Sequence, residues 1–81
     1  MTRRVVLYTK PGCHLCEVVE RVISSVRSKR DFDFVHANIL DDSADFEKYR
    51  NDIPVVTVDG VEIARHGLTA AELEHALSAE A

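Results

Sequence analysis

The spacing of hydrophobic and polar positions changes several times along this chain. Residues 3–9 contain a run of Val and Leu with little alternation, which is typical of a strand in the middle of a sheet. Pro11 and Gly12 then end the run. From Leu15 onward, apolar residues recur with the spacing of one helical face, which predicts an amphipathic helix. The residues of this apolar face are Leu15, Val18, Val19, Val22, Ile23 and Val26.

The middle of the chain predicts a second strand and a short helix. Residues 32–39 alternate between apolar and polar positions, as a half-buried strand does. Asp42 is placed to cap the helix that follows, and Asp45 three residues later completes a capping pair. Because a strand, helix and strand of this length favour a parallel pair, we expect the first two strands to be parallel with a right-handed crossover.

A hairpin and a capped helix complete the pattern. Asp59-Gly60 separates two strand-like runs, 55–58 and 61–64, and this dipeptide is a strong hairpin signal. Thr69 and Glu72 have the spacing of a capping box. Leu68 is placed to pack on Leu73, and the inward face of the last helix is Leu73, Ala76 and Leu77. The predicted order is therefore βαβαββα.

Size and charge limit the function of the chain. Its 81 residues suffice for one domain, so we expect residues 1–81 to fold as a single unit. The formal net charge is −4 and no basic stripe is interleaved with aromatic residues, so we expect no nucleic-acid partner. The apolar run behind Arg3 and Arg4 is too short for a signal peptide or a membrane span. We therefore expect a cytoplasmic monomer without a membrane partner.

The only two cysteines, Cys13 and Cys16, lie where the first helix is predicted to begin. In the reducing cytosol, so close a pair is more often catalytic or metal-binding than a structural disulfide. A structural zinc site needs four ligands, and no second ligand pair occurs at metal spacing among the histidines. These are His14, His36, His66 and His75. Redox chemistry is therefore favoured over the two alternatives, structural zinc and inert cysteines.

The two thiols are predicted to be unequal. Cys13 lies at the exposed tip of the helix, where backbone N–H groups and the helix dipole favour a thiolate. Cys16 precedes Val19 by three residues, at the edge of the buried face. Cys13 is thus the expected nucleophile, and Cys16 then resolves the mixed disulfide. Lys10 and His14 are placed to add positive charge near Cys13, with simple solvent exposure as the alternative for each.

The Ile53-Pro54 pair has two interpretations. A proline is tolerated at the first position of a strand without any further role. Alternatively, a cis bond before Pro54 would turn backbone groups outward toward a substrate chain.

With these features in place, the chain resembles the glutaredoxin-like branch of the thioredoxin superfamily. The resemblance covers residues 8–16, 53–56 and 58–60 and the final capped helix. It implies a thioredoxin-like α/β fold, with a four-stranded mixed sheet and helices on both faces. It also implies a cis bond before Pro54 next to Cys13, and dithiol exchange through Cys13 and Cys16. The substrate groove is then expected along Lys10, the backbone at Ile53, and Thr69.

This sequence departs from glutaredoxins at two places. His14-Leu15 stands between the cysteines, where glutaredoxins usually carry Pro-Tyr or a similar pair. Arg65 and His66 lie in the segment between the last strand and last helix, where glutaredoxins usually carry Gly-Gly. Larger side chains there would block or redirect the γ-glutamyl group of glutathione, so Arg65 is also a candidate substrate-binding residue.

The sequence therefore predicts a small oxidoreductase that reduces protein or glutathione mixed disulfides. We expect no bound cofactor and no metal, with glutathione as a candidate co-substrate and a reductase that recharges the dithiol. One alternative is an iron–sulfur cluster held by Cys13 between two subunits, with external thiols completing the ligand set. Another is a dedicated electron donor recharged by a thioredoxin-type reductase, which the side chains of Arg65 and His66 favour.

Overall fold

The computed structural model describes residues 2–78, and the elements in that range follow the predicted order. The predicted single domain was 1–81, of which residues 1 and 79–81 lie outside the described range. No helix within residues 2–78 has the length and apolar character needed to cross a membrane. The elements are β1 (Arg4–Thr9), α1 (His14–Arg27), β2 (Asp33–Asn38), η1 (Ile39–Asp41), α2 (Ser43–Tyr49), β3 (Val55–Val58), β4 (Val61–Arg65) and α3 (Ala70–Ser78).

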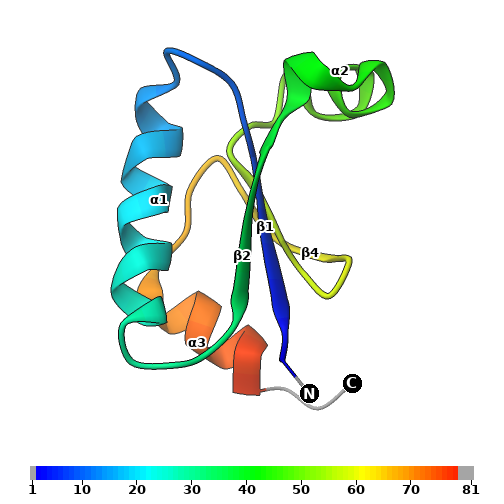
Figure 1. The fold of residues 1–81 in the computed structure, drawn as a ribbon. Helices are drawn as coiled ribbons and strands as arrows, with labels where there is room; N and C mark the ends of the chain where they lie inside the picture. Colours follow the sequence, from blue (N-terminus) through cyan, green and yellow to red (C-terminus); the bar gives the residue numbers. More distant parts are fainter. Residues whose placement is uncertain (1, 79–81) are drawn as a thin grey trace.

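The strands form one mixed sheet in the order β2-β1-β3-β4. β1 pairs with β2 in parallel, whereas the β1–β3 and β3–β4 pairs are antiparallel. Figure 1 shows α1 and α3 on one side of the sheet and α2 on the other. The expectation of a four-stranded mixed sheet with helices on both faces is confirmed.

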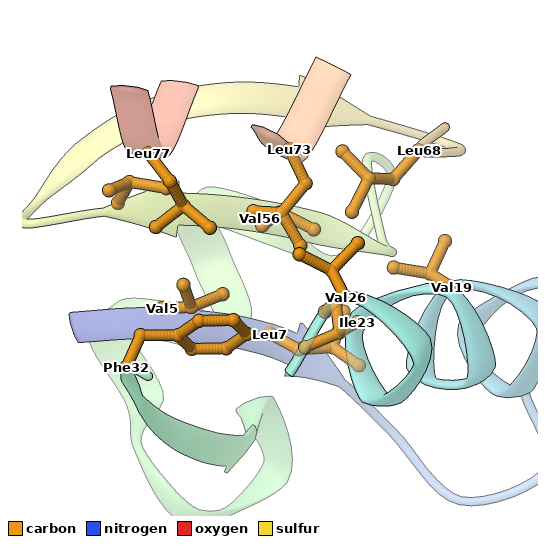
Figure 2. Close-up of a cluster of buried hydrophobic side chains, with 11 residues drawn as sticks. Val5, Leu7, Val19, Ile23, Val26, Phe32, Val56, Leu68, Leu73 and Leu77 are labelled. Atoms are coloured by element: carbon orange, nitrogen blue, oxygen red, sulfur yellow. The ribbon is translucent and has the colours of Figure 1, made fainter. Parts of the chain in front are cut away.

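The larger hydrophobic cluster lies between the sheet and the two helices α1 and α3 (Figure 2). Alternate residues of the central strand β1, Val5 and Leu7, are both 0% exposed and face this cluster. Burying one side chain of this size contributes about 1.5–3 kcal/mol relative to leaving it in water. The residues that join them are Val19, Ile23, Val26, Phe32, Val56, Val58, Leu68, Leu73 and Leu77. This cluster holds α1 and α3 against the sheet.

A smaller cluster lies beneath α2 on the opposite face. It contains Ile39, Tyr49 and Val55, with Tyr8 packed against it. The Tyr8 and Tyr49 ring centroids are 4.5 Å apart. Burial of Tyr8, followed by its interaction with Tyr49, raises the pKa of the Tyr8 hydroxyl above its ordinary value. Val55 of β3 belongs to this cluster, whereas Val56 and Val58 of the same strand belong to the larger one. β3 is therefore buried on both faces.

The capping box predicted at α3 is present, and Asp42 caps α2 as predicted, but the Asp42 N–H donates to the Ile39 carbonyl at 3.4 Å and not to Asp45. Asp42 Oδ1 accepts hydrogen bonds from the backbone N–H groups of Ala44 and Asp45, at 2.9 and 3.1 Å. At α3, the Thr69 N–H donates to Glu72 Oε1 at 2.9 Å, and the Glu72 N–H donates to Thr69 Oγ1 at 3.1 Å. Caps of this kind typically contribute about 1 kcal/mol each. They fix where α2 and α3 begin.

The β3–β4 hairpin turns at Asp59 and Gly60, which both have positive φ values of 51° and 86°. Two positive φ values suit the turn that joins twisted strands most tightly. Asp59 also accepts a hydrogen bond from the Arg4 N–H at 2.9 Å and pairs with the Arg3 guanidinium. These contacts, the Arg4 N–H first, hold the pKa of the Asp59 carboxyl below its usual range.

The apolar face predicted for α1 is wider than the face that the fold buries. Val19, Ile23 and Val26 are buried as predicted, but Leu15 is 53% exposed and Val18 is 40% exposed. The prediction that these two residues share the buried face is wrong. Periodicity identifies residues on one side of a helix, whereas the width of the sheet and the position of α3 decide how much of that side is covered.

Candidate functional site

Cys13 and Cys16 lie at the N-terminus of α1 and are joined by a disulfide, with their Cα atoms 5.2 Å apart. Cys13 is the N-cap residue, with an extended backbone, and is half-buried. Cys16 lies in the first turn and is only 3% exposed. Gly12, with a φ of +80°, makes the turn between β1 and this cap. The structure thus has the unequal exposure that the sequence predicts.

The sulfur of Cys13 takes the place that a capping oxygen usually occupies. The Cys16 backbone N–H donates to Cys13 Sγ at 3.1 Å. An N-terminal helix end favours negative charge, because its first N–H groups have no partner within the helix and the dipole is positive there. A thiol in such a position has a lowered pKa. The geometry therefore favours Cys13 as the thiolate of the pair.

Both sulfur-bearing residues line a groove with a volume of about 340 Å³ between the start of α1 and the end of β2. The backbone of residues 9–12 forms one of its walls. The groove also receives polar side chains from α1, from β2 and from the segments that follow β1 and β2. They are Lys10, Glu17, Glu20, His36, Asn38 and Asp41.

The parallel pairing of β1 with β2 brings His36 to this groove. His36 lies opposite Leu7, so its side chain shares the face of the sheet that α1 covers. His36 Nε2 is 3.4 Å from Glu20 Oε2 of α1. Neither residue is predicted from the sequence to belong to the site. Two signals pointed to them: Glu20 comes one helical turn after Cys16, and His36 comes two residues after the core-facing Phe34.

Pro54 does not line this groove, and its side chain is fully buried. The Ile53-Pro54 bond is cis, as the family resemblance implies. The Pro54 carbonyl accepts a hydrogen bond of 2.7 Å from the His66 N–H, which ties the β4–α3 connection to the start of β3. His66 has a φ of 69°, and its Nε2 is 3.7 Å from Asp52 Oδ1.

Arg65 is held by carboxylates of its own chain. Its Nε and one terminal nitrogen donate to Glu62 at 2.7 and 2.8 Å, and its other terminal nitrogen is 3.4 Å from Asp52 Oδ2. The hydrogen bonds between Arg65 and Glu62 raise the pKa of the guanidinium and lower that of the carboxyl. A substrate carboxylate would have to compete with these partners for Arg65.

Of the residues predicted to bind substrate, Lys10 lines the groove that contains the cysteines. His14 is 80% exposed in its side chain, and its Nδ1 is 3.8 Å from Glu17 Oε2. Thr69 uses its hydroxyl in the cap of α3. The other predicted substrate-binding residues do not line this groove; they are His14, Ile53, Pro54, Arg65 and Thr69. Their roles toward substrate stay predictions.

Over residues 2–78, no group of three or more His, Cys, Asp and Glu residues is arranged to hold a metal ion. The iron–sulfur alternative takes ligands from a second subunit and from external thiols, so it also stays a prediction.

The chain matches a known family model and is similar to several solved structures. The model of the family described as "Glutaredoxin-like domain (DUF836)" matches residues 4–78. The solution structure of protein Ne2328 from Nitrosomonas europaea is 25% identical, with a TM-score of 0.83, and the match covers 96% of this chain and 94% of that one. A structural genomics target protein from X. campestris is 27% identical, with a TM-score of 0.77 and coverage of 95% and 99%.

A more distant similarity concerns the fold alone. Thioredoxin 1 from Thermosipho africanus is 17% identical, with a TM-score of 0.63, and the match covers 91% of this chain and 93% of that one. The thioredoxin-like fold that the sequence resemblance implied is therefore confirmed.

Proposed function

Because the chain belongs to the glutaredoxin-like domain family, we propose that it is a thiol–disulfide oxidoreductase in which Cys13 is the attacking residue. One observation carries this proposal. Cys13 Sγ caps α1 and accepts the Cys16 N–H at 3.1 Å, beside an open groove. The cap stabilises a thiolate, and the groove leaves space next to it for a second sulfur compound.

The reaction has two exchanges and needs no bound cofactor. The Cys13 thiolate attacks one sulfur of a substrate disulfide, the substrate S–S bond breaks, and the second substrate sulfur leaves as a thiolate. Cys16 then attacks Cys13 Sγ, so the remaining substrate sulfur leaves and the Cys13–Cys16 disulfide forms. The substrate gains two electrons and the dithiol loses two. The distance of 5.2 Å between the Cα atoms suits the closed product.

Two single substitutions test this order of events. Cys13→Ser removes the nucleophile, so turnover of a mixed-disulfide substrate falls to the rate without protein. Cys16→Ser keeps the attacking thiol and removes the resolving one, so a mixed disulfide on Cys13 accumulates and is detected as added mass. The variants are matched, because each retains one thiol. Turnover by Cys13→Ser, or the absence of an adduct with Cys16→Ser, would contradict the proposal.

A second candidate concerns how the dithiol is recharged. Arg65 and His66 place large side chains where glutaredoxins carry Gly-Gly, and both lie within 4 Å of Asp52, at 3.4 and 3.7 Å. This arrangement supports recharging by a thioredoxin-type reductase in place of glutathione. The protein would then act as an electron donor for a disulfide-containing protein. A comparison of the two recharging systems tests this candidate.

A further inference from the structure

The resolving step requires Cys16 to lose a proton in an unfavourable place. Cys16 is 3% exposed, and on the buried side of α1 it is followed by Val19 and Ile23. Burial in apolar surroundings favours the neutral thiol over the thiolate. The N-terminal helix end is already used by Cys13, whose sulfur accepts the Cys16 N–H. Fast resolution therefore calls for a proton acceptor within reach of Cys16.

The groove provides a route for that proton. Cys16, Glu20 and His36 all line it, Glu20 one turn beyond Cys16 on α1 and His36 on the neighbouring strand β2. Its volume of about 340 Å³ has room for several waters, since each takes about 30 Å³ in the liquid. The groove therefore has space for water to link the thiol to the imidazole.

Among the charged groups that face the groove, His36 is the suitable acceptor. The carboxylates are Glu17, Glu20 and Asp41, and Lys10 is the amine. An ordinary carboxylate is too weak a base for a thiol proton, and an ordinary lysine is already protonated at neutral pH. Histidine is the side chain that exchanges a proton between about pH 5 and 8.

Glu20 fixes the orientation of the imidazole. Its carboxylate lies 3.4 Å from His36 Nε2, which leaves Nδ1 to take up a proton. The Phe34 ring meets the imidazole edge-on, with the ring centroids 5.1 Å apart. Both side chains of the pair are about half exposed, at 47% and 45%, so the pair stays in contact with water.

We propose that the Glu20–His36 pair accepts the proton of Cys16 through groove water during resolution. This inference rests on the proposed function. The Cys16 proton passes to His36 Nδ1, and the resulting thiolate attacks Cys13 Sγ. The bond between Cys13 and the substrate sulfur breaks, and the substrate leaves as a thiolate that takes the proton back from the imidazolium. The two electrons stay within the thiol–disulfide exchange. His36 acts through water, and Glu20 is its positioning residue.

The two exchanges are separable by stopped flow. The reduced protein is mixed with excess dithiobis(nitrobenzoate), and each exchange releases one coloured thiolate. Attack by Cys13 depends on the reagent concentration, whereas resolution by Cys16 does not. In the unmodified protein we expect the second rate to rise with pH and then to level off once the histidine acceptor has lost its proton. In His36→Gln the rate near neutral pH falls about tenfold or more, and it rises with pH in proportion to the Cys16 thiolate, without that levelling.

Glu20→Gln is expected to lower the second rate by a smaller factor, because the imidazole remains but is less well oriented. His75→Gln, on the exposed side of α3, is the matched control and leaves both rates unchanged. The rate of the first exchange, attack by Cys13 on the reagent, should stay within about twofold of the unmodified value in all three variants.

The outcomes separate the two proposals. Slow attack by Cys13 in the unmodified protein, no faster than by an ordinary thiol, would contradict the proposed function. If attack by Cys13 is fast but His36→Gln leaves the rate and pH profile of resolution unchanged, only the role of His36 is contradicted, and the proposed function stands.

Discussion

Two regions of the molecule differ in how their charges are used. We call the groove lined by Glu20 and His36 the groove side, and the segments 52–54 and 65–69 the loop side. On the groove side the charged groups, the Glu20–His36 pair among them, surround an open space of about 340 Å³. On the loop side they pair with one another, because Arg65 and His66 both face Asp52. In our proposals, the groove side therefore serves proton transfer and the loop side selects the reductant.

Replacing His66 tests the loop side, and it is the substitution for which we expect the largest effect. His66→Gly removes the imidazole and its Cβ, and glycine adopts a φ of 69° without the cost that L residues have there. We expect glutathione with glutathione reductase to recharge this variant about tenfold faster, which corresponds to about 1.4 kcal/mol of relieved crowding. Recharging by a thioredoxin-type reductase, measured with the same disulfide substrate, should not improve.

His66→Ala is the matched control, because it removes the imidazole but retains a Cβ and the same backbone requirement. We expect its rate of recharging by glutathione to lie between those of the unmodified protein and His66→Gly. If glutathione recharges the unmodified protein as fast as His66→Gly, the loop side does not select the reductant.

A smaller effect is expected from Glu62→Gln, because the Glu62 carboxylate pairs with Arg65 of the loop side. Hydrogen bonds from Arg65 hold the pKa of the Glu62 carboxyl below its ordinary value. Folding is thus favoured by this carboxylate above about pH 4.3, and that contribution is lost as the pH falls through the lowered value. The urea midpoint of the unmodified protein should fall between about pH 5 and 3, and that of Glu62→Gln should fall less.

The difference should be small, because the pair lies at the surface and is screened by solvent. Glu47→Gln, at an exposed position of α2, is the control and should follow the unmodified protein. An equal acid-induced decrease in the Glu62→Gln and unmodified midpoints would show that the Arg65–Glu62 pair does not stabilise the loop side.

Features encoded within a few residues could be predicted from the sequence. The Thr69–Glu72 cap, the Asp59-Gly60 turn and the unequal exposure of the cysteines are all present as expected. Each depends on residues close together in the chain, where the period of the helix or strand fixes the geometry.

Features that join distant segments could not be predicted in the same way. Glu20 meets His36 only because the parallel register sets Leu7 opposite His36 beneath α1. Asp52 meets Arg65 across the ends of β3 and β4. The exposure of Leu15 likewise depends on how far the sheet and α3 extend. Register and packing between elements decide these contacts, and hydrophobic periodicity contains neither.

The central claim is that Cys13 is the stabilised thiolate, and its alkylation rate tests this most directly. The reduced protein is treated with iodoacetamide across a range of pH, and the modified peptides are quantified by mass spectrometry. We predict that the alkylation rate of Cys13 reaches half its maximum at least about one pH unit below the ordinary thiol value of about 8.5. Cys16 should be alkylated more slowly at every pH. Equal rates for the two cysteines, with both midpoints near about 8.5, would contradict the account.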